Sequence, residues 1–419
     1  MPIRKIAITN FKSFKELEVE LGNFSLFIGV NASGKSNFIQ IFKFLRDIIQ
    51  SGLDNAISLQ GGVEYLRNIN IGASENLSFR VISDTDFGFA IPGEKKAGLI
   101  GLKFYESIFD MSLSFKDPNS GFKIAKDEVI SKCKYFRLKK KKKKIEEEEL
   151  IGEGEFILSR SNGNLLFDLK NQPEVPISKK VLYPTFLKHD KLPSKSLILE
   201  RPFFPFLPQL ADDFRSMSIY DFDPKLPKKA SPITGKAELE EDGSNLSIVL
   251  KNIVENEKKK NKFCNLICEL LPFIDDLNVE KFADKSLLFK LREKYFEKEY
   301  LPASFISDGT INITALIISL YFERKGITII EEPERNIHPY LISKVTNMLK
   351  EASKDKRIIV TTHNPEMVKH AGLENIFLVS RSKEGFSVIS KPANKESVKT
   401  FLKNEIGIDE LFVQSLLEI

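Results

Sequence analysis

Short runs of alternating apolar and polar residues dominate the chain from residue 3 to about residue 169. A period of two, broken by turn residues, is typical of β-strands with one buried face. The segments RKIAITNF, NLSFRVI, KYFRLKK and GEFILSRSNGNLLFDL follow this pattern. Residues 1–171 are therefore predicted to form a mainly antiparallel lobe. One long helix interrupts it, because apolar residues recur at helical spacing at Phe38, Ile41, Phe42, Leu45, Ile48 and Ile49.

The pattern changes twice further along the chain. Residues 172–300 are punctuated by prolines and contain amphipathic patterns such as NLSIVLKNIVEN and NKFCNLICELLPFI, which predict a mainly helical insertion or lid. In residues 301–419, the apolar strand patterns GITIIEE, RIIVTTH and NIFLVSR accompany the helical patterns INITALIISLYF and YLISKVTNMLKEAS. Alternation of this kind is typical of a parallel sheet. We therefore predict an α/β fold in three stretches, 1–171, 172–300 and 301–419.

Composition indicates a large buried core. The chain has 419 residues, of which 42% are hydrophobic. No apolar run reaches the roughly 18 residues of a membrane span, and the N-terminal residues alternate as a strand does instead of forming a signal-peptide core. We expect a cytoplasmic protein with no membrane partner. The three cysteines, Cys133, Cys264 and Cys268, favour core packing over a zinc site or a disulfide framework.

The net charge of +5 comes from 63 Lys and Arg against 58 Asp and Glu. This surplus is too small to demonstrate nucleic-acid binding, although it is compatible with a local basic surface. The most biased segment has six lysines at 139–144 and four glutamates at 146–149. A solvated strand edge or loop explains it better than contact with DNA or RNA does, because the glutamates partly cancel the field of the lysines.

A glycine-rich segment joins the strand pattern NFSLFIG to the long helix. Gly29-Val30-Asn31-Ala32-Ser33-Gly34-Lys35-Ser36 fits G-x-x-x-x-G-K-[ST], the phosphate-binding loop, between the strand and the helix that this motif requires. Lys35 is predicted to reach the β- and γ-phosphates, and Ser36 to offer its hydroxyl to Mg²⁺. The helix dipole would face the same negative charge. The nucleotide-binding residues expected here are Gly29, Asn31, Ala32, Ser33, Gly34, Lys35, Ser36 and Asn37.

Two later strand patterns end in polar residues. Glu331 and Glu332 end GITIIEE, and His363 ends RIIVTTH. Because the carboxyl ends of parallel strands meet at one edge of a sheet, we expect these side chains in one site. One carboxylate would face Mg²⁺ and the other would position the attacking water, although capping of a helix after the pair is an alternative. His363 is predicted to hydrogen-bond the γ-phosphate or that water.

The segment SFISDGT precedes the apolar helix pattern INITALIISLYF. Ser307, Asp308, Gly309 and Thr310 would then lie at a helix N-terminus, an arrangement suited to binding an anion. A simple helix cap uses the same residue types. Both interpretations of this segment remain open.

Taken together, NFKSF, GVNASGKSN, FISDGT, IIEEPERNIHP and TTHNP resemble the motifs of ABC-class ATPase heads, specifically the RecF, SMC and OLD-like branch. The resemblance covers essentially the whole chain. The region MSIYDFDP to LEEDGSNLSIVLKNI also resembles the lid of stand-alone RecF-like AAA-type ATPases. By this resemblance Gly29–Ser36 form Walker A, Ser307–Thr310 form the signature loop, Glu331 and Glu332 form the Walker B pair, and His363 is the switch histidine.

The resemblance implies that ATP and Mg²⁺ are the cofactors and that ATP joins two copies in a homodimer, between Walker A of one and the signature loop of the other. Ser36, Glu331 and Gln60 would bind the metal. Gln60 is a candidate Q-loop glutamine, for which a plain turn is an equal alternative, and Lys12 would approach phosphate or DNA or lie on the surface. SDGT replaces a two-glycine signature, and Glu331 replaces an aspartate; both variants occur in the OLD-like branch. The implied catalytic residues are Lys35, Glu332 and His363.

The residues after His363 are too few for the Toprim nuclease domain that OLD enzymes carry, so this chain is not expected to cut nucleic acid itself. We expect an ATP-driven dimerising switch in a prokaryotic anti-phage or genome-defence system, which controls a separate effector such as a nuclease or toxin. The alternative is a RecF-like ATPase that acts on DNA in repair or maintenance. The strand-rich first lobe disfavours a transporter motor, and no substrate-binding signature supports a soluble kinase.

Overall fold

The fold is described from a computed structural model of the chain. It covers residues 3–93, 98–116, 121–141, 144–173, 191–201, 207–282, 285–296, 298–403 and 407–418, with backbone alone at residues 140–141, 144–148, 208, 399, 401–403 and 418. The lysine and glutamate run at 139–149 thus lies largely outside the described side chains, and part of the predicted insertion lies outside the described residues. The chain forms two compact units. Unit 1 comprises Met1–Leu21, Ser36–Ser216 and Ser380–Ile389, and unit 2 comprises Gly22–Lys35, Met217–Val379 and Ser390–Ile419.

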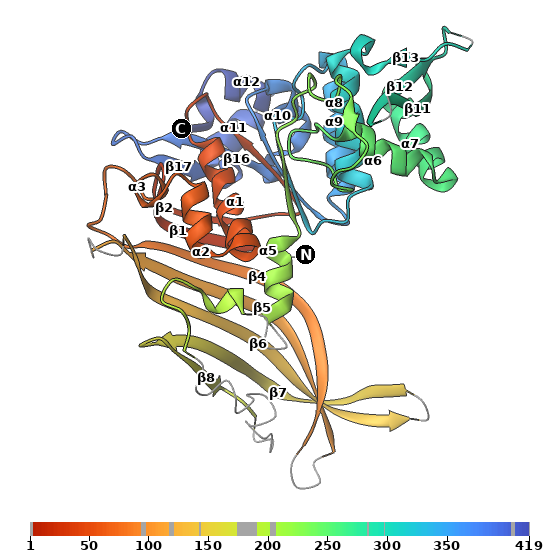
Figure 1. Cartoon of the computed structure of the whole chain (residues 1–419). Coiled ribbons are helices and arrows are strands. Elements are labelled where there is room, and N and C mark those ends of the chain that lie inside the picture. Colours follow the sequence, from red (N-terminus) through yellow and green to blue (C-terminus); the bar gives the residue numbers. More distant parts are fainter. Residues whose placement is uncertain are drawn as a thin grey trace. The chain divides into compact units, whose positions relative to one another are not determined.

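Unit 1 is built on an antiparallel sheet with the strand order β2-β1-β4-β5-β6-β7-β8. Its strands alternate between buried and exposed positions, as in β4, where Phe79 and Val81 are buried and Arg80 is exposed. Register shifts interrupt three of the pairings, and such bulges bend long strands. Figure 1 shows β4 to β7 as long curved ribbons. The strands are β1 (Lys5–Phe11), β2 (Phe14–Glu20), β4 (Leu77–Pro92), β5 (Leu99–Ser114), β6 (Lys123–Lys141), β7 (Lys144–Ser161) and β8 (Asn164–Lys170).

Helix α1 (Lys35–Ser51) begins at the end of the glycine-rich segment and continues into unit 1. The ring of Phe44 lies 5.4 Å from that of Phe79 on β4, and the ring of Phe79 lies 5.3 Å from that of Phe11 on β1. These fully buried aromatic rings attach the helix to the sheet. The other helical segments of unit 1 are α2 (Leu53–Leu59), α3 (Val63–Leu66), the 3₁₀ helix η2 (Ile198–Glu200) and α5 (Leu207–Arg215).

A second, largely parallel sheet has the strand order β17-β16-β3-β15-β14-β9 and belongs mainly to unit 2, although residues 380–389, with most of β17, are assigned to unit 1. Strand β3 is parallel to β15 and β16, and β14 is parallel to β15 and β9. Every residue of β3 and of β15 is buried, as expected for strands covered on both faces. The strands are β3 (Phe24–Ile28), β9 (Met217–Tyr220), β14 (Ile327–Glu331), β15 (Arg357–Thr362), β16 (Ile376–Arg381) and β17 (Ser387–Ser390).

Helices and a smaller sheet complete unit 2 around one hydrophobic core. Helix α8 (Asp308–Tyr321) is buried from Thr310 to Leu320, because it has almost no polar face. The small sheet consists of β10 (Ser231–Pro232), β11 (Ile274–Phe282), β12 (Ser286–Glu293) and β13 (Leu301–Pro302). The remaining helices are α6 (Leu246–Val254), α7 (Glu257–Leu270), η3 (Ala303–Phe305), α9 (Pro339–Ala352), α10 (Pro365–Ala371), η4 (Leu373–Asn375), η5 (Pro392–Asn394), α11 (Glu396–Lys403), α12 (Ile408–Val413) and η6 (Leu416–Glu418).

The predicted α/β fold is confirmed, with a strand-rich first part and a parallel sheet built from strands that the pattern predicted. One stretch differs from its expectation. Residues 172–300, predicted to be mainly helical, also supply β9, which joins the parallel sheet beside β14, and the β11–β12 hairpin. Strand β9 has only four residues, too few to give a periodic signal, and its pairing with β14 brings it into the sheet. The division into three consecutive stretches stays a prediction.

Candidate nucleotide-binding site

The glycine-rich segment forms the loop between β3 and α1, as predicted. Gly34 has a φ of 119° and Ala32 a φ of 62°, conformations in which several backbone N–H groups can face one side of a loop. A Cβ added at Gly29 would lie 2.2 Å from the carbonyl oxygen of Val379. Only glycine fits at this position, because β3 and the neighbouring strand β16 leave no room for a side chain.

Lys35, the first residue of α1, is 9% exposed. Its ammonium group donates hydrogen bonds to the carbonyl oxygens of Gly29, at 2.7 Å, and Val30, at 3.1 Å. Burial lowers the pKa of Lys35, and the negative charges of Glu332, Glu334 and Glu331 act in the opposite direction. The lysine therefore contacts the loop backbone and lies within the field of the carboxylates at and after the end of β14.

The other predicted loop residues have varied surroundings. Asn31, Ala32 and Ser36 are exposed, whereas Ser33 and Gly34 are buried. Asn37 lies one residue further into α1, and its side-chain amide donates to the hydroxyl of Ser13 at 2.9 Å. Asn37 thus has a structural contact with the β1–β2 turn, and its predicted role in nucleotide binding stays a prediction.

Glu331 ends β14, opposite Thr361 of β15, and Glu332 leaves the strand with a φ of 44°. This left-handed conformation is uncommon for a residue with a side chain. The backbone N–H of Glu332 still donates to the carbonyl oxygen of Thr361 at 2.9 Å. The second carboxylate is thereby turned away from the direction that a regular strand would give it.

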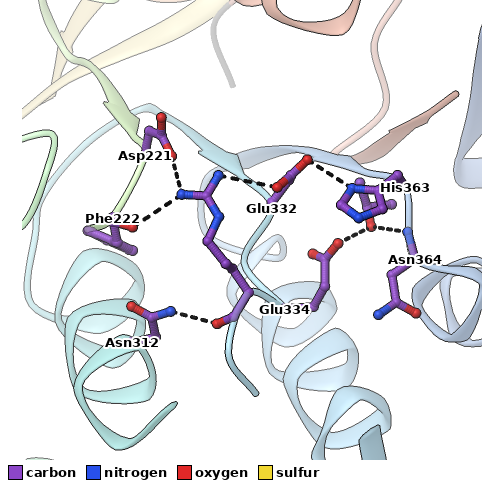
Figure 2. Close-up of polar contacts among 9 residues, drawn as sticks. Asp221, Phe222, Asn312, Glu332, Glu334, His363 and Asn364 are labelled. Carbon is purple, nitrogen blue, oxygen red and sulfur yellow. Dashed lines mark hydrogen bonds and ion pairs between the residues drawn. The ribbon is translucent and has the colours of Figure 1, made fainter. Parts of the chain in front are cut away.

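His363 and Glu332 are in direct contact, as expected from their strand ends (Figure 2). The Nδ1 atom of His363 lies 2.9 Å from Oε1 of Glu332, and Nη2 of Arg335 donates to Oε2 of Glu332 at 3.2 Å. Burial raises the pKa of Glu332, but the contacts with Arg335 and His363 outweigh it, so that the pKa lies below its ordinary value. Glu332 is therefore held as a carboxylate between two nitrogen groups.

Arg335 also extends away from Glu332. Its Nη1 atom donates to Oδ1 of Asp221 at 2.9 Å, and its carbonyl oxygen accepts a hydrogen bond of 2.6 Å from the side-chain amide of Asn312 on α8. The positive charge is close to two carboxylates, and the pKa of Arg335 is raised although burial opposes the rise. Neither Arg335 nor Asp221 was expected in the site.

Glu334 is the third carboxylate of IIEEPER and is 6% exposed. Its Oε1 atom accepts a hydrogen bond from the hydroxyl of Thr362, while no described residue donates to Oε2. Burial raises the pKa of Glu334, and the bond from Thr362 reduces this rise. The same hydroxyl of Thr362 accepts from the N–H of Asn364 at 2.9 Å. Glu334 thus ties the turn after β14 to the end of β15.

Ser307 caps α8, because its hydroxyl accepts from the N–H of Thr310 at 3.2 Å. Asp308 pairs with Lys228 at 2.5 Å. A Cβ added at Gly309 would lie 2.5 Å from the carbonyl oxygen of Asn336, so glycine allows close packing against the turn after β14. The helix-cap interpretation of SFISDGT is present in the structure, and anion binding by Ser307 to Gly309 stays a prediction.

Gln60 and Lys12 belong to unit 1. Gln60 follows α2, and its side chain is buried with no hydrogen-bond partner for Oε1 among the described residues. Lys12 lies in the β1–β2 turn with a φ of 46°, and burial lowers its pKa. Their predicted contacts with metal, phosphate or DNA stay predictions.

Residues 24–369 match the AAA_21 family, described as "AAA domain, putative AbiEii toxin, Type IV TA system". The chain belongs to this family. No curated protein matches the chain. The matched range includes both the glycine-rich loop and the strands that carry the carboxylates. The predicted ATPase-type nucleotide-binding fold is thereby confirmed, whereas the roles of individual residues remain to be tested.

Solved structures similar to this AAA_21 chain include three SMC heads. An SMC head bound to the C-winged helix domain of ScpA has 15% identity and a TM-score of 0.48, covering 93% of this chain and 97% of that one. The SMC head domain from Thermotoga maritima has 14% identity and a TM-score of 0.40, covering 93% and 99%. The head with an extended coiled coil bound to the C-terminal domain of ScpA, from Pyrococcus furiosus, has 14% identity and a TM-score of 0.48, covering 97% and 100%.

Sequence reasoning missed four residues of the site, namely Asp221, Asn312, Glu334 and Arg335. Asn312 had a visible signal, because a buried amide in an otherwise apolar helix needs a partner. Glu334 and Arg335 were quoted within IIEEPER without a role. Asp221 had no such signal, since it approaches Arg335 only when β9 pairs with β14.

Among the helices of the described residues, none has the length and apolar character needed to cross a membrane.

Proposed function

We propose that this AAA_21 protein binds and hydrolyses ATP and uses the cycle as a dimerising switch that controls a separate effector. The observation that carries the proposal is the position of Lys35. A nearly buried ammonium group donates to the carbonyls of the predicted phosphate-binding loop, within the field of three glutamates at the end of β14 and in the turn after it. A buried cation of this kind is suited to a polyanionic ligand with its metal ion.

The residues present fit ATP and Mg²⁺. Lys35 would exchange its bonds to the loop carbonyls for bonds to the β- and γ-phosphates, and the N–H groups at the start of α1 would face the same oxygens. Ser36 and Glu331 would hold Mg²⁺, which supplies charge neutralisation for phosphoryl transfer. No three His, Cys, Asp or Glu within the described ranges form a metal site by themselves.

Glu332 would orient the attacking water. Its lowered pKa keeps the carboxylate ionised near neutral pH, so that it accepts hydrogen bonds from water. His363 holds Oε1 of this carboxylate and would sense the γ-phosphate from the end of β15. Hydrolysis would remove the group on which these contacts converge.

The switch would act through a second copy of the chain. Ser307, the N-cap residue of α8, is exposed, and so is Phe305 at the end of η3, at 77%. The proposed homodimer encloses ATP between the loop at residues 29–36 of one copy and Ser307 to Gly309 of the other. A close relation to the RecF and OLD-like branch is part of this proposal.

The family description refers to a toxin and to a type IV toxin–antitoxin system. It supports a setting in genome defence, where the effector in trans would be a nuclease or a toxin. The alternative is an ATPase acting on DNA in repair or maintenance. In the first case the ATP-bound dimer would hold a second protein, and in the second case it would hold DNA.

The test is affinity purification of the tagged Glu332→Gln protein from its native cells in Mg-ATP, with Lys35→Ala as the matched control. We expect a stoichiometric second protein with the first variant and much less with the second. Recovery of DNA without a second protein would instead favour maintenance. Failure of both the wild type and Glu332→Gln to bind ATP in vitro would overturn the ATPase proposal itself.

A further inference from the structure

Arg335 occupies an unusual position in the turn after β14. Its guanidinium group contacts two carboxylates from different elements, Asp221 after β9 at 2.9 Å and Glu332 after β14 at 3.2 Å. His363 contacts the other oxygen of Glu332. The Glu332 carboxylate is therefore restrained on both oxygens, and Asp221 in turn anchors the arginine.

The backbone of Arg335 is restrained by α8. The side-chain amide of Asn312, which is 4% exposed, donates to the carbonyl oxygen of Arg335 at 2.6 Å. One turn earlier, Gly309 packs so closely on Asn336 that an added Cβ would lie 2.5 Å from its carbonyl oxygen. The first turns of α8 thus touch two consecutive backbone carbonyls of the segment that carries the guanidinium group.

These contacts form one continuous path within unit 2. The path runs from the SFISDGT loop through the buried amide of Asn312 to the backbone of Arg335, and from its side chain to the carboxylate of Glu332. Because buried packing and hydrogen bonds resist small displacements, a shift at the start of α8 would move Arg335 and change the restraint on Glu332.

We propose that Arg335 is a positioning residue that couples the start of α8 to Glu332. This inference rests on the proposed ATPase function and deepens it, because it gives the SFISDGT loop a route to the hydrolytic carboxylate in the same copy. An isolated exposed ion pair contributes little, whereas Arg335 is fixed by a second carboxylate and by a backbone bond. The guanidinium fork matters as well, since a lysine cannot bridge two carboxylates in this way.

Steady-state ATP hydrolysis by Arg335→Ala tests the proposal. We expect kcat to fall about tenfold or more, because misplacement of a catalytic group is costly, while KM for ATP stays within about twofold since the loop with Lys35 is unchanged. Arg335→Lys should recover part of kcat, and Asn312→Ala should lower kcat in the same direction. The matched control is Arg215→Ala, which removes an arginine from another exposed pair with an aspartate three residues before it.

The decisive comparison uses single-turnover hydrolysis in the Glu332→Gln background. Because Arg335 acts through Glu332, adding Arg335→Ala to Glu332→Gln should change the remaining rate by less than about twofold. An equal loss in both backgrounds, an unchanged kcat in Arg335→Ala, or a raised KM at constant kcat would overturn the inference. Failure of the proposed function is separately visible, because wild type and Lys35→Ala would then hydrolyse ATP equally poorly, and the inference would fall with it.

Discussion

Lys35 concentrates the chemistry of the site in one side chain. Burial lowers the pKa of its ammonium group, which donates hydrogen bonds to the carbonyl oxygens of Gly29 and Val30. A charged group in such surroundings is stabilised by bound anions more than by water. In the proposed function, this residue would link the conformation of the loop to its affinity for phosphate.

The first prediction concerns this ammonium group. Lys35→Ala should weaken ATP binding by about tenfold or more, because it removes a charge-assisted contact that is worth more than about 1.4 kcal/mol in a buried site. Fluorescent-nucleotide titration measures the effect. Lys43→Ala, on the same helix outside the loop, should bind nucleotide as the wild type does, and equal affinity for both variants would contradict the role of Lys35.

The second prediction concerns backbone space in the same loop. Gly29→Ala should abolish most nucleotide binding, because its Cβ would lie 2.2 Å from the carbonyl oxygen of Val379 and the loop must shift. Ala32→Gly is the matched control, since Ala32 already has a φ of 62° that glycine adopts without strain. We expect Ala32→Gly to keep affinity within about twofold in the same titration. Wild-type affinity in Gly29→Ala would show that the loop is less tightly packed than its geometry indicates.

At the scale of elements, helices are attached to sheets by buried polar contacts as well as by apolar packing. In unit 1, Asp213 of α5 is 8% exposed and accepts a hydrogen bond of 2.7 Å from Ser83 of β4. In unit 2, Lys356 is 7% exposed and donates to the carbonyl oxygens of Ser319, in α8, and of Glu323, just after it. Such contacts fix one register of helix against strand, because each buried polar group needs its partner.

Asp213 gives stability a pH dependence. Burial raises its pKa to about 6, although bonds from Ser83 and Gln209 lower it. Between its ordinary value of 3.8 and about 6, the native state binds more protons than the unfolded chain. This group's contribution to the free energy of unfolding is therefore complete below the ordinary value and is lost as the pH rises through about 6.

The third prediction follows from this sign. Asp213→Asn keeps an acceptor for Ser83 and has no proton to lose, so its free energy of unfolding should fall by about 2 kcal/mol less than that of the wild type between pH 4 and pH 7. Urea unfolding at several pH values measures the difference. Asp212→Asn, whose side chain is exposed, should follow the wild-type curve. Parallel curves for wild type and Asp213→Asn would refute the assignment.

At the scale of the whole molecule, each of the two units consists of three separate segments of the chain, which alternate along the sequence. Residues 29–35 of the glycine-rich loop lie in Gly22–Lys35, and the carboxylates of Glu331, Glu332 and Glu334 lie in Met217–Val379, so these parts of the candidate site are far apart in the sequence. The intervening residues 36–216 belong to unit 1. Long-range pairing of this kind makes the site a property of the folded chain.

The fourth prediction concerns assembly. Glu332→Gln should bind ATP, hydrolyse it at least about a hundredfold more slowly, and accumulate as a dimer, because the step that removes the γ-phosphate is blocked while the contacts that need it remain. Light scattering after size-exclusion chromatography in Mg-ATP measures the dimer, and the same sample in Mg-ADP is the control. Undiminished ATP turnover by Glu332→Gln would contradict the hydrolytic role of Glu332. A Glu332→Gln protein that binds ATP but stays monomeric would contradict the proposed dimer.

The amino-acid sequence by itself determined the local features of this protein. The long helix after the loop, the apolar helix at residues 311–322 and the strands before Glu331 and His363 follow from spacing between near neighbours, which a period of two or 3.6 records directly. The glycine-rich loop was also predictable, because the glycines, lysine and serine of its motif lie within eight consecutive residues. These features need no knowledge of what packs against them.

Tertiary structure alone decided which distant groups meet. Strand β9 reaches the parallel sheet through its pairing with β14, and this pairing brings Asp221 to Arg335. The left-handed turn at Glu332 places one carboxylate between Arg335 and His363, a geometry that alternation along a strand does not contain. The physical reason is that contacts across a sheet depend on strand order and register, which short-range periodicity leaves open.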